Sequence, residues 1–257
     1  MLHDRRDAGM PDLAAALVAA METDAFTLRF QPQYACIDNA IIGAESLVRW
    51  EHVRFGKVGG EALFAMARRV GLAGALAQHT RRAALRHAAS WPDTLRLSVN
   101  ITAHDLANDS FATAILRDLD ECGFAADRLT LEITEQAELS ALHRTAVRLR
   151  VLAEEGIAIA LDDFGTGFCN FNYLKTLPLD LLKLDRSMVE GIADDAQDLA
   201  VFRAILAMAD ALGLDVMAEG VETEAQRTVV AREACSGWQG FLGAKPVDAA
   251  QFAQMVG

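Results

Sequence analysis

The chain has 257 residues, of which 52% are hydrophobic and 23% are charged. This length and composition can bury a large core in one domain, and they are unlike those of disordered or collagen-like chains. The formal net charge of −12 argues against non-specific nucleic-acid binding, which needs a basic surface. An anionic substrate would need bound cations to offset the acidity around it. The four cysteines form no Cys-x-x-Cys pair, which argues against a structural zinc site and fits a reducing compartment.

The N-terminal segment places Arg5 and Arg6 before the apolar run Leu13–Met21, loosely like a signal peptide. Acidic residues crowd the front of this run, and no small-residue cleavage site follows it. We therefore expect residues 1–25 to form an amphipathic helix and tail. No apolar run reaches the length of a membrane span, so we expect a cytoplasmic protein.

Two predicted strands follow at residues 26–35 and 41–49, around the Asp38-Asn39 turn. Beyond them, segments with strand and helix patterns alternate along the chain. The later predicted strands cover residues 95–100, 129–133, 157–161, 181–185, 216–219 and 238–242. The predicted helices cover residues 61–72, 75–90, 110–122, 140–155, 170–177, 196–212 and 224–234, with a short helix after Asp248.

Repeated strand–helix units imply a mostly parallel sheet. About eight strands in a chain of this length favour a closed barrel over an open sheet. The tight first turn makes the first two strands antiparallel. The predicted fold class is therefore α/β, a modified (β/α)8 TIM-like barrel with one antiparallel strand near the N-terminus. No linker or low-complexity tract interrupts the pattern, so we expect one domain over residues 1–257.

Polar side chains gather at the C-terminal ends of the predicted strands, which share one face of a parallel barrel. They are Glu45, Arg49, Asn100, Glu132, Glu135, Asp162, Asp163, Lys183, Asp185, Glu219 and Glu222. Taken singly, such a carboxylate is explained as a solvated loop residue or a helix cap, and Asn100 alone is better explained as a cap. Taken together, the carboxylates would repel one another unless cations lay among them. Oxygen ligands of this kind suit Mg²⁺ or Mn²⁺ rather than zinc.

The adjacent pair Asp162-Asp163 is able to bridge two metal ions that share one carboxylate. Sites of this kind, with ions roughly 3.5–4 Å apart, serve phosphoester displacement. The loop over residues 163–170 contains Gly165 and Gly167, which permit unusual backbone angles. An ordinary turn into a helix explains these glycines as well, but beside a metal site the loop becomes a candidate gate.

These motifs resemble a known family. The segment from Gly43 to Trp50, with Glu45, Leu47 and Arg49, resembles the signature of EAL-domain cyclic di-GMP phosphodiesterases. The likeness continues, in order, through Phe30-Gln31-Pro32, Ser98-Val-Asn100, Leu131-Glu132-Ile-Thr-Glu135, Leu161-Asp162-Asp163-Phe-Gly-Thr-Gly167, Leu182-Lys183-Leu-Asp185, Ala218-Glu219-Gly-Val-Glu222 and Gln239-Gly-Phe. An ordered set over nearly the whole chain is far more specific than any one tripeptide.

The resemblance implies a barrel that hydrolyses cyclic di-GMP to linear pGpG with two Mg²⁺ or Mn²⁺ ions. The implied ligands of one ion are Glu45, Asn100, Glu132 and Asp162. Asp162 would bridge to the second ion, which Asp163 and Glu219 would support directly or through water. Lys183 would orient and polarise the attacking water, and Arg49 would grip a substrate phosphate. The implied groove residues are Gln31, Leu47, Asp185 and Gln239, and Glu135 would anchor the Gly165–Gly167 loop.

The chain also departs from the family pattern. Ser46 stands where the family has alanine, and Cys169-Asn170-Phe171 replaces the usual Ser-Ser-Leu. The segment Val58-Gly59-Gly60 lacks the usual proline, and Arg68 stands where glutamate is common. None of these positions is an implied ligand, but the change in the loop bears on its closure and on turnover.

The expected partners are cyclic di-GMP, a second copy of the chain in a homodimer and a regulatory protein, without nucleic acid. Two other functions stay open. The altered loop fits a catalytically weak or inactive cyclic di-GMP receptor, although every implied ligand is present. A lysine among carboxylates at a barrel mouth also suits a Mg²⁺-dependent enzyme that abstracts a proton from a carboxylate substrate. Arg49 and the groove glutamines favour a phosphate and a base over such a substrate.

Overall fold

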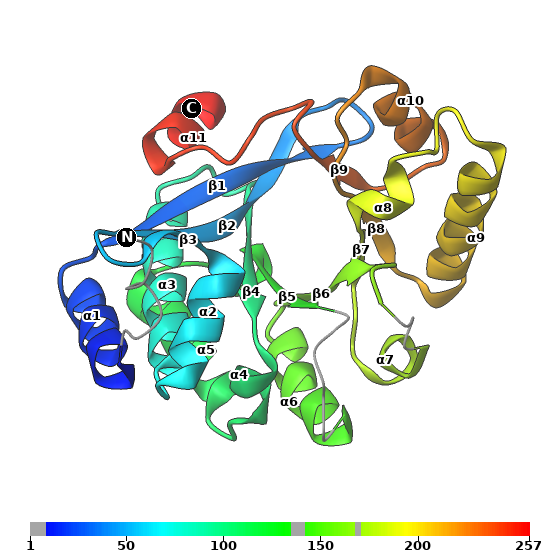
Figure 1. Cartoon of the computed structure of the whole chain (residues 1–257). Helices are drawn as coiled ribbons and strands as arrows, with labels where there is room; N and C mark the ends of the chain where they lie inside the picture. Colours follow the sequence, from blue (N-terminus) through cyan, green and yellow to red (C-terminus); the bar gives the residue numbers. More distant parts are fainter. Residues whose placement is uncertain (1–8, 135–141, 168–170) are drawn as a thin grey trace.

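The computed structural model describes residues 9–134, 142–167 and 171–257, and in them a closed barrel surrounded by helices (Figure 1). The ring consists of β1 (Phe26–Ala35), β2 (Ile41–His52), β4 (Arg96–Ile101), β5 (Leu129–Thr134), β6 (Ala158–Phe164), β7 (Leu181–Leu184), β8 (Asp215–Ala218) and β9 (Gly237–Gln239). Pairing of β1 with both β9 and β2 closes it. The predicted TIM-like barrel is confirmed.

β1 is the strand that breaks the parallel pattern, since it runs antiparallel to both of its neighbours. The other neighbouring pairs within the ring are parallel. In the register of β1 with β2, Gln31 lies opposite Glu45, and in its register with β9, Gln33 lies opposite Gln239. The antiparallel strand therefore brings a glutamine beside the first carboxylate of the barrel mouth.

The sequence-based prediction lacks several short elements, among them a 3-10 helix at Ala126–Arg128. β3 (Gly56–Gly59) pairs antiparallel with β2 outside the ring, and α4 (Ala103–Ala107) and α8 (Arg186–Val189) are short helices. Four or five residues are too few to establish a hydrophobic period. Their signals are local instead: Thr102 caps α4 in a capping box, and the side chain of Asp185 accepts a hydrogen bond from Ser187 N at the start of α8.

The remaining helices match the predicted ones within a few residues and surround the ring (Figure 1). They are α1 (Met10–Glu22), α2 (Gly60–Arg69), α3 (Ala73–Ala88), α5 (Phe111–Cys122), α6 (Leu142–Glu154), α7 (Phe171–Thr176), α9 (Ala196–Leu212), α10 (Glu224–Arg232) and α11 (Ala249–Val256). Thr223 and Asp248 begin α10 and α11 with capping boxes, in which side chain and backbone satisfy each other's hydrogen bonds.

Two hydrophobic clusters stabilise this arrangement. The larger one fills the space between the parallel strands and their helices, with fully buried Leu131, Ile159 and Leu182 at its centre. The smaller one lies where α1, α2 and α3 pack on β2 and β3, around Leu17 and Trp50. Within the described part of the chain, the model contains no helix with the length and apolar character of a membrane span.

Candidate active site

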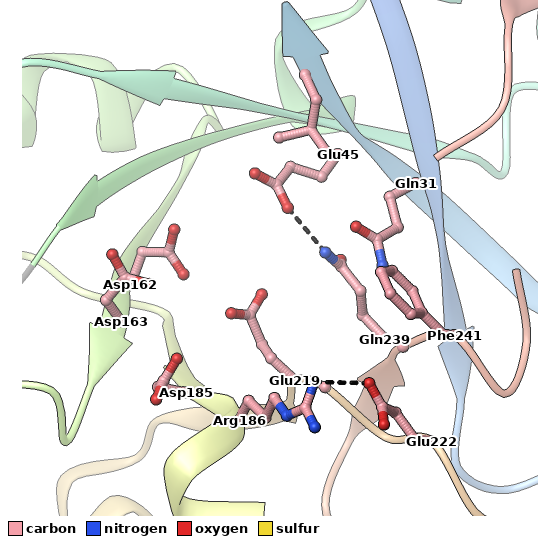
Figure 2. Close-up of a pocket in the computed structure, with 13 residues that line it drawn as sticks. Gln31, Glu45, Asp162, Asp163, Asp185, Arg186, Glu219, Glu222, Gln239 and Phe241 are labelled. Carbon is pink, nitrogen blue, oxygen red and sulfur yellow. Dashed lines mark hydrogen bonds and ion pairs between the residues drawn. The ribbon is translucent and has the colours of Figure 1, made fainter. Parts of the chain in front are cut away.

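A pocket opens at the C-terminal ends of the parallel strands, where the sequence places its polar residues. Eight of the predicted site residues line it: Gln31, Glu45, Leu47, Asp162, Asp163, Asp185, Glu219 and Gln239. Figure 2 shows the carboxylates of Glu45, Asp162 and Glu219 pointing into one space from β2, β6 and the end of β8. The topology of a parallel barrel therefore gathers residues that are far apart in the sequence.

Lys183 lies beneath this space and is fully buried. Its Nζ is 2.9 Å from Glu132 Oε1, 3.0 Å from Asp162 Oδ1 and 2.9 Å from Glu219 Oε1. Glu45 Oε2 lies further away, at 3.7 Å. Four carboxylates around one ammonium group leave an excess of negative charge in a buried place. On sequence alone, Lys183 could also be a surface lysine. Its full burial shows that this interpretation is wrong.

The buried charges shift one another's protonation. Burial raises the pKa of Glu132 well above its ordinary value and the pKa of Glu219 to about 8, although Lys183 opposes both shifts. Burial likewise raises the pKa of Asp162. For Lys183, burial alone would lower the pKa, but the surrounding carboxylates together raise it well above its ordinary value. Lys183 is therefore charged at neutral pH, whereas some carboxylates hold protons unless a further cation is present.

Two side-chain amides fix the orientation of Glu45. Asn100 Nδ2 donates to Glu45 Oε1 at 2.8 Å, and Gln239 Nε2 donates to Glu45 Oε2 at 2.8 Å (Figure 2). The explanation of Asn100 as a helix cap is wrong, because Thr102 caps the following helix. An amide that donates through nitrogen turns its carbonyl oxygen elsewhere, so Asn100 retains an oxygen that is able to bind a cation.

The adjacent residues Asp162 and Asp163 reach the same site because β6 is irregular. Consecutive side chains of a regular strand point to opposite faces. Here the register of β6 with β7 shifts between Leu161 and Phe164, so that β6 contains an extra residue. Asp163 adopts a positive φ of 57°. A β-bulge of this kind turns a side chain in a new direction, and it explains how both carboxylates face Glu219.

Asp163 is half-buried, and burial and the charge of Asp162 raise its pKa to about 6. The backbone after it forms a tight turn, in which both the N–H and the hydroxyl of Thr166 donate to Asp163 O, at 3.2 and 3.0 Å. Gly165 has a φ of 107°, which favours glycine. Glu135, the predicted anchor of this loop, lies outside the described residues, as do Cys169 and Asn170.

Three predicted site residues, Asn100, Glu132 and Lys183, are outside the pocket lining but are linked to its carboxylates by a hydrogen bond or ion pairs. Arg49 does not line the pocket either. Its guanidinium donates to Val48 O at 2.8 Å, and its side chain is half-buried. Five lining residues escaped the sequence-based prediction of the site: Arg186, Gly220, Glu222 (named only as a strand-end carboxylate), Gly240 and Phe241. Arg186 and Glu222 form an ion pair at 2.7 Å (Figure 2). Arg186 directly follows the Leu-Lys-Leu-Asp segment, which was the only signal for it.

Gly220 explains why Arg186 fits beside the carboxylates. It has a positive φ of 64°, and a Cβ atom on it would lie only 2.5 Å from Arg186 Cβ. Any other residue at this position would displace the start of α8 or the end of β8. Gly220 thus lets the start of α8 approach the end of β8. In this arrangement Glu219 pairs with Lys183, and Glu222 pairs with Arg186.

The carboxylates fit divalent cations. Glu45, Glu132 and Asp162 each offer an oxygen within 4.8 Å of the others, and so do Asp162, Asp163 and Glu219. Glu132 Oε2 is buried without a hydrogen-bond partner among the described residues, and the buried oxygens Glu132 Oε1, Asp162 Oδ1 and Glu219 Oε1 share the single ammonium group of Lys183. Hard oxygen donors with unused lone pairs suit Mg²⁺ or Mn²⁺. Asp162 belongs to both groups.

Comparisons with known proteins agree with this geometry. The cyclic di-GMP phosphodiesterase NbdA of Pseudomonas aeruginosa is 36% identical over 232 residues, which are 89% of this chain and 30% of that protein. The bifunctional diguanylate cyclase/cyclic di-GMP phosphodiesterase MucR of the same species is 32% identical over 255 residues, 98% of this chain and 36% of that protein. The chain thus spans about two fifths or less of the curated relatives it matches.

Solved structures and a family model extend the likeness. The structure of the PaMucR phosphodiesterase in complex with c-di-GMP has a TM-score of 0.84 and 33% identity, and the match covers 93% of this chain and 99% of that chain. The EAL domain of Mycobacterium smegmatis DcpA has a TM-score of 0.77 and 29% identity, over 91% of this chain and 96% of that chain. The model of the EAL domain matches residues 14–246. The chain belongs to the EAL domain family.

Proposed function

We propose that this chain is a metal-dependent phosphodiesterase that hydrolyses cyclic di-GMP to linear pGpG. The observation that supports the proposal most is the pair of carboxylate groups that share Asp162 above the buried Lys183. Similarity to relatives named cyclic di-GMP phosphodiesterases supports the substrate. A carboxylate shared between two groups would hold two ions close together, as two-metal phosphoester chemistry needs.

Two Mg²⁺ or Mn²⁺ ions would complete the site. Glu45, Asn100, Glu132 and Asp162 would hold one of them, and Asp162, Asp163 and Glu219 would hold the other or its waters. Bound there, the ions would supply Lewis-acid activation of water and would neutralise charge on the attacking and leaving oxygens. They would also allow an acidic pocket to bind a dianion, since they cancel the negative charge that the carboxylates bring.

The residues of this chain would position the water and the substrate. Lys183 is charged, and its three N–H donors face Glu132, Asp162 and Glu219 at 2.9–3.0 Å. Metal ions bound to these carboxylates would free a donor of Lys183 to orient and polarise the attacking water. Gln31, Leu47, Asp185 and Gln239 would line the groove for the dinucleotide. Arg49 would leave the carbonyl of Val48 to contact a phosphate, which a rotation of its side chain allows.

The experiment that tests the proposal is a product assay on the purified chain. Incubation with cyclic di-GMP and either Mg²⁺ or Mn²⁺ should give pGpG, and an excess of chelator should stop the reaction. Intact substrate with both metals, under conditions where calorimetry shows binding, would identify a cyclic di-GMP receptor instead. Binding of small carboxylic acids in preference to cyclic di-GMP would favour the proton-abstracting enzyme.

Regulation is a separate part of the proposal. We infer that a homodimer or a regulatory protein controls the site here. Size-exclusion chromatography with light scattering, with and without cyclic di-GMP, would show whether dimerisation and substrate binding are linked.

A further inference from the structure

The bulge that carries Asp163 is supported from below by a methionine outside the lining of the pocket. Met188, in α8, packs against the main hydrophobic core and is half-buried. It directly contacts the loop after Asp163, because a Cβ atom on Gly165 would lie 2.5 Å from Met188 Cγ and 2.8 Å from Sδ. The side chain of Met188 therefore limits how far the turn after β6 can approach α8.

The turn that Met188 contacts has unusual backbone conformations at two of three consecutive residues. Asp163 has a φ of 57° and Gly165 a φ of 107°. A left-handed conformation is unfavourable for any residue with a Cβ atom, and it persists only when the surroundings hold it. Thr166 holds one side of the turn through its two hydrogen bonds to Asp163 O. The contact between Gly165 and Met188 holds the other side.

Met188 is itself held firmly. Val189, its neighbour, is fully buried, and Met188 N donates to Asp185 O at 2.9 Å. Asp185 N donates to Phe164 O at 3.2 Å, which ties α8 to the end of β6. α8 and the bulge are thus connected by a backbone hydrogen bond on one side and by the Met188–Gly165 contact on the other. A thioether side chain is long and unbranched enough to fill such an irregular gap.

We propose that Met188 is a positioning residue for metal binding, which keeps the carboxylate of Asp163 turned toward Asp162 and Glu219 by supporting Gly165. The proposal rests on the role of Asp163 in the proposed function. Without the Met188 side chain, the turn has room to relax toward α8, and the positive φ of Asp163 loses one of its supports. The carboxylate then spends less time in the group that it forms with Asp162 and Glu219.

The test measures Mn²⁺ binding directly by electron paramagnetic resonance titration, with turnover as a second readout. Met188→Ala should weaken the binding of the more weakly held ion about tenfold, equivalent to about 1.4 kcal/mol, with a smaller effect on the KM for cyclic di-GMP. Met188→Gln keeps the unbranched stem that contacts Gly165, so its Mn²⁺ affinity should stay within about twofold of the wild type. Met208→Ala is the matched control, since Met208 is also half-buried against the main core but lies in α9.

A double-mutant cycle with Asp163→Asn separates positioning from general destabilisation. If Met188 acts through Asp163, Met188→Ala should change Mn²⁺ affinity less than about twofold in the Asp163→Asn background. An equal loss in both backgrounds, or a loss no larger than that of Met208→Ala, would overturn the proposal. If Met188→Ala does not fold, Met188→Val shortens the side chain that contacts Gly165 while keeping it apolar, and it should also weaken Mn²⁺ binding; unchanged affinity in that variant would overturn the proposal as well. The double-mutant cycle measures Mn²⁺ binding, so it tests the role of Met188 even if the chain does not hydrolyse cyclic di-GMP.

Discussion

Asp162 and Asp163 are consecutive residues of one strand, yet both carboxylates lie in one group with Glu219, within 4.8 Å of one another. The bulge in β6 and the positive φ of Asp163 make this possible. Asp162 alone also belongs to the group formed with Glu45 and Glu132. The site therefore depends on Asp162 more than on any other carboxylate.

Replacing this shared residue should disable both metal positions. Asp162→Asn keeps the volume of the side chain but removes its charge, so Mn²⁺ affinity and turnover should both fall by more than the 10–100-fold that changes around metal ligands typically cost. Calorimetric titration with Mn²⁺ and a turnover assay check this result. Asp194→Asn, at an exposed position, is the control. Near-normal turnover in Asp162→Asn would show the metal assignment to be wrong.

Removing Lys183 should act on the chemical step. Protonated lysine is not a metal ligand, so Lys183→Ala should still bind both ions, while turnover falls by about 10²–10⁴-fold, the usual contribution of a group that activates water. KM should change little. Single-turnover kinetics measure the chemical step, and the exposed Lys175→Ala serves as the control. Lost substrate binding with normal single-turnover chemistry would make Lys183 a groove residue.

The buried carboxylates should make the metal-free protein sensitive to pH. Glu219 has its pKa raised to about 8 and Asp163 to about 6, whereas both titrate near pH 4 when unfolded. The folded state therefore binds more protons than the unfolded state between about pH 4 and 8. The stability that these protons confer is complete below about pH 4, and it is lost as the pH rises through about 6 and about 8.

Urea unfolding from pH 5 to 8.5 in the presence of a chelator should thus give a falling free energy of unfolding. Saturating Mg²⁺ should flatten this profile, because cations stabilise the ionised carboxylates in place of protons. Glu219→Gln should remove most of the fall between about pH 6 and 8, where Asp163 no longer contributes. A free energy of unfolding that stays constant or rises over this range without metal would contradict the assignment of protonated carboxylates.

Glu135 gives a prediction that rests on the sequence alone. If it anchors the Gly165–Gly167 loop, one or two hydrogen bonds, each worth about 0.5–1.5 kcal/mol, help to decide whether the ordered loop dominates. Glu135→Ala should then lower turnover, raise KM and shift the metal dependence toward higher Mg²⁺. Steady-state kinetics at several Mg²⁺ concentrations measure these effects. Unchanged kinetics with a lower melting temperature would make Glu135 a structural helix cap.

The sequence predicts the barrel and most of its mouth because both depend on simple rules. Alternating strand and helix patterns set the topology, and the topology places Glu45, Glu132, Asp162 and Glu219 on one face. The bulge at Asp163 is not predictable in this way, because it depends on the pairing of β6 with β7 rather than on a pattern within β6. The same limit explains why Asn100 suggested a helix cap: its partner, Glu45, is 55 residues away.

The contribution of α8 also lies beyond what the sequence pattern predicts. Arg186 and Met188 belong to a helix of four residues, and each acts on a segment distant in the chain. Arg186 reaches Glu222 across the close approach that Gly220 permits, and Met188 contacts Gly165. Such roles follow from contacts between loops, which periodicity does not encode.

We propose that the carboxylate groups hold two divalent ions that share Asp162. A crystal structure with Mn²⁺ and cyclic di-GMP, with anomalous scattering measured for manganese, tests it most directly. We expect two anomalous peaks roughly 3.5–4 Å apart, each within coordination distance of Asp162, with Glu45, Asn100 and Glu132 around one peak and Asp163 and Glu219 near the other. A single peak, or two peaks that do not share Asp162, would contradict it.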